Sequence, residues 1–173
     1  MTSSRNSAVY RTVSATGDSH ESLRLWLRLL ACSSMVEGRV RSRLREHYDC
    51  TLPRFDVLAQ LESASRDHVR GLTMSELSRR LMVTNGNLTG LIERLVQESL
   101  VSRVTLPSDR RSQIVRITAA GKRALHAMAP KHEEWIEELF MGLGEPDRAQ
   151  LYELLGKLKA SIRAGLDQED AGD

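Results

Sequence analysis

The sequence contains little cysteine and no long hydrophobic run, and each absence excludes a class of protein. Its 173 residues include only Cys32 and Cys50, too few for a disulfide scaffold, and neither belongs to a CxxC pair. We therefore expect both to be reduced thiols in a cytoplasmic protein. No apolar stretch approaches the roughly 18 residues that a transmembrane helix requires, so we expect no membrane segment. Residues 1–20 are polar, lack the apolar centre of a secretory signal, and are predicted to form a mobile tail.

The sequence also lacks the motifs that mark most enzymes and metal sites. It has no GxSxG nucleophile turn, phosphate-binding loop, HExxH or GxGxxG. No two histidines are spaced four residues apart, as a zinc site on one helix would need. The five histidines are His20, His47, His68, His126 and His132. We therefore predict that the chain is not an enzyme and holds no metal or cofactor.

Charge is small in total and uneven along the chain. The formal net charge is +2. Residues 64–116 carry nine arginines and five acidic residues, a net charge of +4, whereas residues 117–173 have a net charge of −4. A basic centre between less basic ends indicates a local contact with a polyanion.

Apolar residues recur at helical spacing over most of the chain. Residues 21–48 contain no proline and carry apolar side chains on one face, which predicts a helix of about seven turns. A second helix is expected to begin at Leu52, because Pro53 suits a first turn. Two further helices are predicted after Thr118, one to about Met141 and one with a near-heptad apolar seam. The seam consists of Leu151, Leu154, Leu155, Leu158 and Ile162.

Between these long helices the chain has the spacing of a helix-turn-helix. Thr73 and Glu76 form a capping-box pattern at the start of a short helix. After a sharp turn, Thr84 can cap a second helix, whose buried face is predicted to comprise Leu88, Leu91, Ile92 and Leu95. Gly86 and Gly90 then lie within this second helix, where each costs about 1 kcal/mol relative to alanine. We infer that the exposed side of this helix approaches another molecule closely.

After Leu100 the apolar period changes to two, which predicts a two-stranded hairpin with a turn near Pro107. The predicted fold is therefore mainly α, with a small two-stranded hairpin beside a helix-turn-helix. We expect a single domain over residues 21–165. Its parts are a lobe at about 52–117 and flanking helices at about 21–48 and 119–164, with a solvated acidic tail at 166–173.

This arrangement suits double-stranded DNA, with the second helix of the pair in the major groove. Asparagine and threonine side chains can bond base edges, and backbone N–H groups at a helix start can hold a phosphate. The residues predicted to lie at this groove are Thr84, Asn85, Gly86, Asn87 and Thr89. Arg79, Arg80 and Arg94 are predicted to contact phosphates.

The hairpin tip adds a second predicted DNA contact. It carries Arg110 and Arg111, and arginine suits the negative potential of a narrow minor groove. Asp109 is predicted to orient one of these arginines through a charge-assisted pair. Hairpin geometry alone leaves open which of the two enters the groove.

The long helices carry more apolar surface than one small lobe can cover, so we expect a homodimer. A two-fold dimer would present two recognition helices to two half-sites about one helical turn apart in a pseudo-palindromic operator. A monomeric helical bundle is the alternative for the apolar surface. A helical adaptor that binds no DNA is the alternative for the function.

Two segments, MSELSRRLMVTNGNLTGLIERLVQESLV and SDRRSQIVRITAAGK, together resemble the MarR family of winged helix-turn-helix repressors. The matching positions include Asp109, Arg111, Thr118 and Gly121, whereas Ile117 replaces the leucine usual in the family. The resemblance implies a homodimeric repressor whose small-molecule ligand binds between the dimerisation helices and the DNA lobe and weakens operator binding. It also favours Arg111 as the arginine that enters the minor groove.

A narrower resemblance concerns the effector. RFDVLAQL, MSELSRRLMVTNGN and HEEWIEELF are similar to MarR-type regulators of aromatic-acid catabolism. This implies an aromatic effector, first a hydroxycinnamoyl-CoA-like thioester and alternatively a free aromatic carboxylate or other phenolic. The residues assigned to the ligand are Trp26, Leu30, Ser33, Ser34 and Arg54. Small residues at 31–34 either leave room for a ligand or let another helix cross, and the arginines within 39–45 either meet CoA phosphates or form a solvated face.

Overall fold

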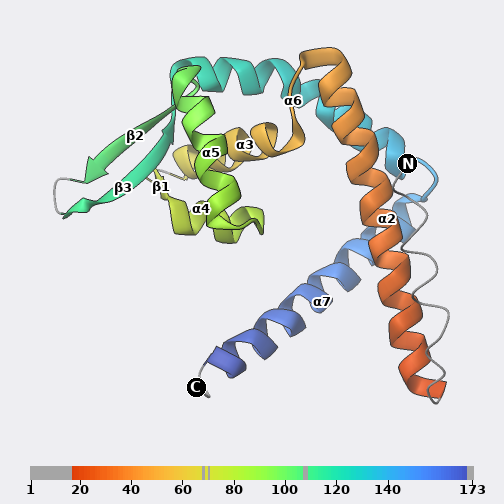
Figure 1. The fold of residues 1–173 in the computed structure, drawn as a ribbon. Coiled ribbons are helices and arrows are strands. Elements are labelled where there is room, and N and C mark those ends of the chain that lie inside the picture. Colours follow the sequence, from red (N-terminus) through yellow and green to blue (C-terminus); the bar gives the residue numbers. More distant parts are fainter. Residues whose placement is uncertain (1–16, 68, 70, 107–108, 171–173) are drawn as a thin grey trace, which may run out of the picture.

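The chain folds into a compact lobe from which two long helices extend (Figure 1). The structure, a computed structural model, describes residues 17–67, 69, 71–106 and 109–170, and for residues 17–19, 85, 106, 109–112 and 166–170 it describes the backbone alone. In chain order the elements are α2 (Gly17–Tyr48), α3 (Leu52–Arg66), β1 (Leu72–Thr73), α4 (Met74–Leu81), α5 (Asn85–Gln97), β2 (Val101–Leu106), β3 (Asp109–Ile117), α6 (Ala119–Phe140) and α7 (Glu145–Asp170). The elements from α3 to β3 form what we call the lobe.

The fold is mainly helical with a small antiparallel sheet, as predicted, but the sheet has one strand more than expected. β1 pairs with β3, with Leu72 opposite Val115 and Thr73 opposite Ile114. The predicted hairpin supplies the other two strands, so the order is β1-β3-β2. A strand of two residues is too short to display a period of two, which is why the sequence pattern did not reveal it.

Both predicted tails are partly helical. α2 begins at Gly17, inside the segment 1–20 that was assigned to the N-terminal tail. α7 continues to Asp170, inside the acidic segment 166–173. The two corrections have one cause, because polar and acidic residues favour solvent without ending a helix, and no proline interrupts either extension.

The core of the lobe is built from the apolar faces that the periodicity predicted. Side chains from α3, α4 and α5 meet the sheet, the end of α2 and the first half of α6. The most deeply buried side chains include Leu44, Leu58, Leu61, Leu77, Leu88, Ile92 and Leu95. Burying a leucine or isoleucine contributes roughly 1.5–3 kcal/mol each, so this cluster fixes the orientation of α4 and α5.

A polar and aromatic cluster holds α2 against α6. Trp135 of α6 is buried, and its ring centroid lies 5.4 Å from that of His47. The guanidinium of Arg43 lies 5.7 Å from the Trp135 ring centroid and forms an ion pair of 2.7 Å with Glu138. A cation between a ring and a carboxylate is favourable on both sides, so this cluster anchors α2 on α6.

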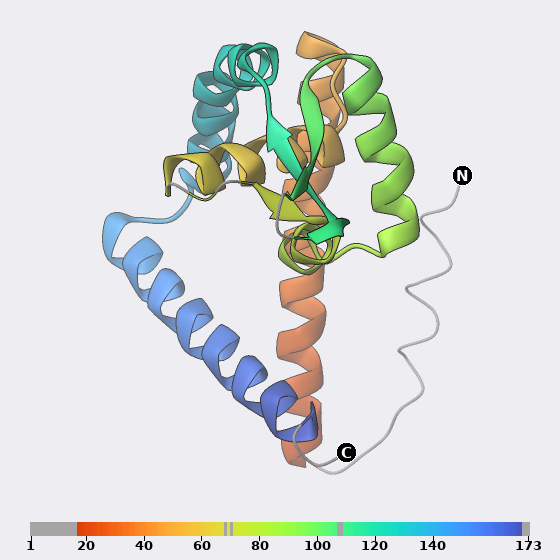
Figure 2. The same cartoon turned by 90° about the vertical axis from the view of Figure 1, so that its left-hand side faces the viewer.

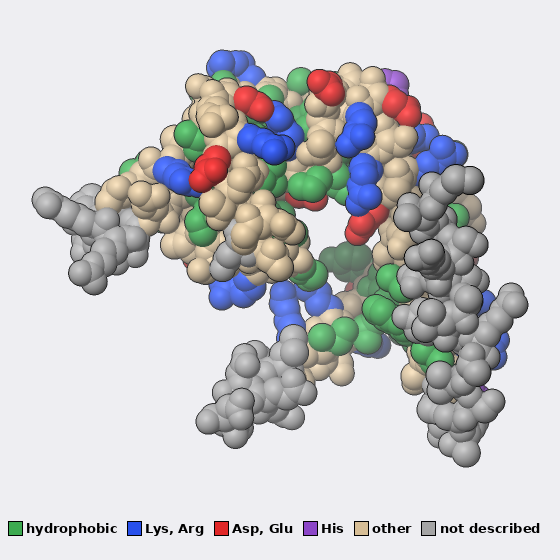
Figure 3. Space-filling view, in the orientation of Figure 1, with side chains coloured by type: hydrophobic (Ala, Val, Ile, Leu, Met, Phe, Trp, Pro, Cys, Tyr) green, Lys and Arg blue, Asp and Glu red, His purple; other side chains and the backbone are tan. Residues whose placement is uncertain are grey.

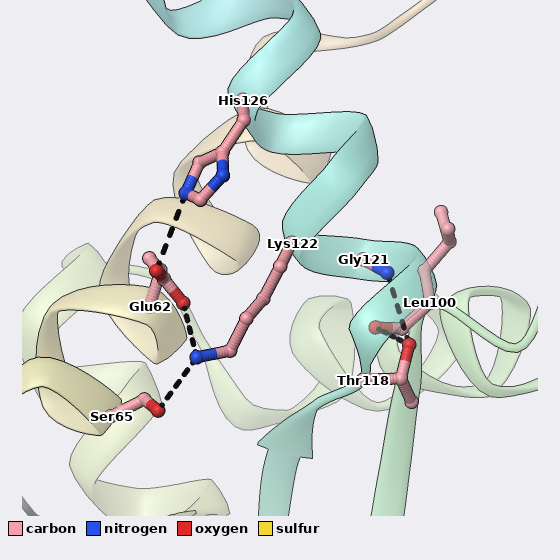
Figure 4. A network of polar contacts seen from close by, with 7 residues as sticks. All are labelled: Glu62, Ser65, Leu100, Thr118, Gly121, Lys122 and His126. Carbon is pink, nitrogen blue, oxygen red and sulfur yellow. Dashed lines mark hydrogen bonds and ion pairs between the residues drawn. The ribbon is translucent and has the colours of Figure 1, made fainter.

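The start of α6 is locked to the lobe at two places, which Figure 4 shows together. At the first, the Thr118 hydroxyl caps α6 by accepting from the Gly121 N–H at 3.0 Å. Its own hydrogen is shared between the carbonyl oxygens of Ser99 at 2.7 Å and Leu100 at 3.0 Å. A Cβ atom on Gly121 would lie 2.1 Å from the Leu100 carbonyl oxygen. Glycine is therefore required here by the close approach of two backbones.

At the second place, a buried carboxylate of α3 meets two basic side chains of α6 (Figure 4). Glu62 is 5% exposed, and its carboxylate lies 3.1 Å from Lys122 Nζ and 3.3 Å from His126 Nε2. Lys122 Nζ also donates to Ser65 Oγ at 3.1 Å. The Lys122 contact to Glu62 departs from hydrogen-bond geometry, so it acts chiefly as an ion pair. The first two turns of α6 are thereby fixed to the lobe.

α7 leaves the rest of the chain, and its apolar seam is exposed. Figures 1 and 2 show that α7 extends away from the lobe, and Figure 1 shows that its far end is well separated from the far end of α2. Leu154, Leu158 and Ile162 are 54%, 39% and 55% exposed. On α2, Trp26 is 50% exposed. These are the apolar surfaces from which the sequence predicts dimerisation.

Candidate nucleic-acid interface

The helix-turn-helix begins with the predicted capping box. Thr73 Oγ1 accepts from the Glu76 N–H at 3.2 Å, and the Thr73 N–H donates to Glu76 Oε2 at 2.7 Å. The backbone and side-chain hydrogen bonds from Thr73 hold the pKa of Glu76 below its usual value. α4 therefore starts at a defined residue, and it ends at Met82, whose φ of 54° turns the chain toward α5. Ser78 Oγ fixes this turn by donating to the Val83 carbonyl.

α5, the recognition helix, begins as predicted but without the expected side-chain cap. Thr84 occupies the cap position with an extended backbone, and its hydroxyl makes no capping hydrogen bond. The first N–H groups of a helix have no partner within the helix. Since Thr84 does not cap them, the start of α5 is suited to a phosphate oxygen.

The two faces of α5 differ sharply. Leu88, Ile92 and Leu95 are fully buried. Thr84, Gly86, Asn87, Thr89 and Gly90 are exposed on the other side. A Cβ atom added at Gly86 or Gly90 would meet nothing within 4 Å, so packing within the described part of the chain does not require glycine at either position. The Asn85 side chain lies outside the described residues, and its predicted base contact remains a prediction.

Basic side chains flank this face. Arg79 and Arg80 of α4 and Arg94 of α5 are all exposed, and none forms an ion pair with another residue that the structure describes. By contrast, Arg103 of β2 lies 4.0 Å from Glu93. The three arginines predicted to contact phosphates thus lie on the solvent side of the helix-turn-helix, and no carboxylate in the described part of the chain lies within ion-pair distance of them.

The predicted hairpin projects from the lobe as β2 and β3 (Figure 1). Leu106 lies opposite Asp109, which is the first residue of β3. The side chains of Asp109, Arg110 and Arg111 lie outside the described residues. Their backbone is in β3, beside the turn, and their roles at a minor groove remain predictions.

The five residues assigned to an effector are divided between α2 and α3, and none of them lines the cavity described below. Trp26, Leu30, Ser33 and Ser34 lie on α2, where three of them are exposed and Leu30 is half-buried. The Arg54 guanidinium makes a bidentate ion pair with the Glu98 carboxylate, and the longer of its two N–O contacts is 2.8 Å. An anionic ligand at Arg54 would therefore have to displace an internal carboxylate.

A cavity of about 480 Å³ lies instead between α2 and the helix-turn-helix. Its lining residues are Arg41, Arg45, Thr51, Pro53, Asp56, Leu81, Val83, Asn87, Leu88 and Leu91. None of the five residues assigned from the sequence is among them. The sequence carried one partial signal, the pair Arg41 and Arg45 one helical turn apart, but the other walls come from three elements that only the fold brings together.

Comparisons with known proteins agree with this geometry. A model described as "MarR family" matches residues 50–113. The "transcriptional activatory protein BadR" of Rhodopseudomonas palustris is 32% identical over 152 residues, covering 87% of this chain and 84% of BadR. The "HTH-type transcriptional repressor YetL" of Bacillus subtilis is 28% identical, covering 79% of this chain and 80% of YetL.

A solved structure extends the likeness to a complex with DNA. A mutant MarR from E. coli complexed with operator DNA has a TM-score of 0.69 and 25% identity to this chain, covering 83% of this chain and 99% of that one. No helix in the described part of the chain is long and apolar enough to cross a membrane. The matched proteins are named as transcriptional regulators and not as enzymes. The chain therefore belongs to the MarR family and is a DNA-binding transcriptional regulator of the winged helix-turn-helix type.

Proposed function

We propose that the protein is a homodimeric repressor that binds a pseudo-palindromic operator and is released by a small aromatic effector. One observation carries the DNA-binding part of the proposal. The recognition helix buries Leu88, Ile92 and Leu95 completely, while the exposed side of its first two turns presents small or polar groups, including Asn87 and two glycines with open space above them. Such a face can lie close against a groove floor.

The dimeric part of the proposal is supported by the exposed apolar seams of α2 and α7. Leu154, Leu158 and Ile162 lie on a helix that the lobe does not cover (Figure 2). A second copy would bury them and would hold two recognition helices about 34 Å apart, one turn of B-DNA. The hairpins would then lie at the outer ends of the operator, with Arg111 directed to the minor groove.

The regulatory part of the proposal concerns the effector and the direction of control. Among the relatives, YetL is named as a repressor and BadR as an activatory protein. We favour repression, with an aromatic-acyl-CoA thioester as the first effector class and a free aromatic carboxylate or other phenolic as the second. The narrower sequence resemblance to regulators of aromatic-acid catabolism supports this choice.

The proposal is tested by selecting a DNA duplex from random sequence with the full-length chain and titrating it by fluorescence anisotropy. Wild type is expected to bind a two-fold symmetric site with a dissociation constant of about 10⁻⁸ to 10⁻¹¹ M at physiological salt. Asn87→Ala and Arg111→Ala should each weaken this binding by about 1–3 kcal/mol. Arg66→Ala, an exposed arginine at the end of α3, is the matched control.

Failure to enrich any sequence would favour the helical adaptor. Effectors are then added to the formed complex, as a panel of aromatic-acyl-CoA thioesters and the corresponding free acids. Release of the DNA by thioesters alone supports the first effector class, and release by free acids alone assigns the second. A reporter gene under the selected operator shows whether bound protein lowers transcription, and a rise on binding would refute the repressor assignment.

A further inference from the structure

We propose that Met82, in the turn of the helix-turn-helix, is a specificity-determining residue that contacts the C5-methyl group of a thymine in the major groove. The inference rests on the proposed binding of an operator and deepens it by naming a base and the side chain that reads it. It adds an apolar contact from the turn to the polar contacts predicted for the start of α5.

Met82 is unfavourable for the free protein in two independent ways. Its side chain is 89% exposed, more than any other large apolar side chain in the described part of the chain. Its backbone is left-handed, with φ of 54° and ψ of 39°, a conformation that strains any residue with a Cβ atom and does not strain glycine. Helices that end in this conformation most often do so with glycine. A contact with another molecule would explain a methionine at this position.

Hydrogen bonds hold the turn in the shape that exposes Met82. The N–H groups of Met82 and Val83 both donate to the Ser78 carbonyl oxygen, the second at 3.2 Å. The Ser78 hydroxyl donates in turn to the Val83 carbonyl oxygen. The backbone of Met82 is therefore fixed before DNA binds, and only its flexible side chain has to adjust to a surface.

The turn lies where the sequence and the fold place DNA. Figures 1 and 2 show the turn between α4 and α5 at the lower end of the lobe, toward which the hairpin also descends. Figure 3 shows lysine and arginine side chains at this end. Arg79 and Arg80 precede Met82 and are exposed, and Thr84 follows it at the start of the recognition helix. Met82 thus lies between the residues predicted to meet phosphates and those predicted to meet bases.

An apolar side chain has one distinctive target in the major groove. Thymine alone among the four bases presents a methyl group there, and the other bases are read through hydrogen-bond donors and acceptors. A methionine placed against a donor or an acceptor would desolvate it without pairing it. Met82 is therefore expected to favour thymine at one position of each half-site.

The test replaces the thymines of the selected operator one at a time by deoxyuridine, which lacks only the C5-methyl group. The full-length chain is titrated with each duplex by fluorescence anisotropy. At one position of each half-site, wild type should bind about fourfold more weakly, because the burial of one methyl group is lost. Met82→Gly should bind the unmodified operator more weakly and should not distinguish thymine from deoxyuridine at that position. At every other thymine it should respond as wild type does.

Two further variants assign the effect to the apolar side chain. Met82→Leu keeps an apolar side chain and should keep the preference for thymine at that position. Met35→Ala removes a methionine that is 72% exposed on α2, far from the turn in sequence, and should behave as wild type. A partly unfolded variant would lose affinity for both duplexes by the same factor, so it cannot imitate the loss of one base preference.

Urea denaturation of Met82→Gly tests the premise that Met82 does not stabilise the free protein. Glycine relieves the left-handed backbone, so the midpoint should not fall. A lower midpoint, or the absence of any thymine at which the response to deoxyuridine depends on Met82, would overturn the inference. In the second case an enriched operator still supports the proposed function, whereas failure to enrich any sequence would count against both.

Discussion

At the scale of single residues, the exposed glycines of the recognition helix lower the stability of the free protein, so their explanation lies in function. Gly90 lies in the interior of α5 with open space where a Cβ would stand. Glycine in a helix interior costs roughly 0.8–1 kcal/mol relative to alanine. The free protein would therefore be more stable with alanine there, and a molecule that approaches α5 closely from outside would give the glycine a function.

We predict that Gly90→Ala raises the free energy of unfolding by up to about 1 kcal/mol and weakens operator binding. Urea denaturation measures the first effect and an anisotropy titration with the selected operator measures the second. Gly38→Ala is the matched control, because Gly38 is also helical with open space around its Cβ position but lies on α2. It should gain stability and keep DNA affinity. Equal DNA affinity in both variants would show that α5 needs no close approach at Gly90.

Asp56 gives a prediction about pH. Burial and Glu37 raise its pKa from 3.8 in the unfolded chain to about 6 in the fold. The folded state therefore holds the proton more tightly, so this group adds stability below pH 4 and loses that contribution as the pH rises through 6.

Asp56→Asn is thus expected to raise the free energy of unfolding at pH 7.5, on the order of 1 kcal/mol after allowance for partial exposure. At pH 3, below both pKa values, the variant and wild type should be nearly equal. Urea denaturation at the two pH values checks this. A variant that is less stable than wild type at pH 7.5 would mean that the ionised carboxylate has a favourable partner.

At the scale of elements, the bridge from α3 to α6 depends on one buried carboxylate. Glu62 meets Lys122 and His126, which are 38% and 63% exposed as side chains and so remain solvated without it. Glu62→Gln should lower the free energy of unfolding by about 1–3 kcal/mol, because a charge-assisted contact is lost at a buried site. Thermal and urea unfolding measure it.

The surface pair Lys131–Glu134 on the same helix is the control, since both of its side chains are about half exposed. Lys131→Gln should leave unfolding unchanged within error. If the two substitutions have equal effects, the bridge adds nothing beyond an ordinary surface pair. The two sites are far enough apart along α6 for their effects to be read independently.

The elements also show where sequence reasoning succeeds and where it stops. α4, α5 and the hairpin could be predicted because each carries a local signal, such as the Thr73 capping box or the period of two before β3. β1 could not, because two residues have no period. The cavity could not be predicted either, because no local sequence pattern singles out Asp56. Asp56 lines one cavity with Arg45 and Asn87 only through the packing of α2, α3 and α5.

At the scale of the whole molecule, the exposed seam of α7 predicts the oligomeric state. Leu158→Glu with Ile162→Glu places charge on two side chains that are 39% and 55% exposed in the single chain. The dimer should dissociate to a monomer, with operator affinity reduced and helical content retained. Light scattering and circular dichroism measure the two properties. Val69→Glu, an exposed apolar residue of the lobe, is the control and should remain dimeric.

If wild type is a dimer and the α7 double variant is also a dimer, the dimer interface lies elsewhere in the molecule. A monomeric wild type at micromolar concentration would refute the proposed two-half-site binding altogether. Either result leaves the fold of the lobe intact, since its buried cluster contains no residue of α7.

The two sets of contacts that fix the start of α6 to the lobe have a consequence for how the molecule can fit DNA. Because Thr118, Gly121 and the Glu62 bridge fix the first turns of α6 to the lobe, that helix and the lobe rotate as one body. α6 has 22 residues. At 1.5 Å per residue such a helix is about 33 Å long, so a tilt of about 10° at its far end displaces the lobe by about 6 Å. In a dimer, which has one such helix in each copy, a small change at the subunit contact would therefore give the two recognition helices a spacing that no longer matches the pitch of the double helix.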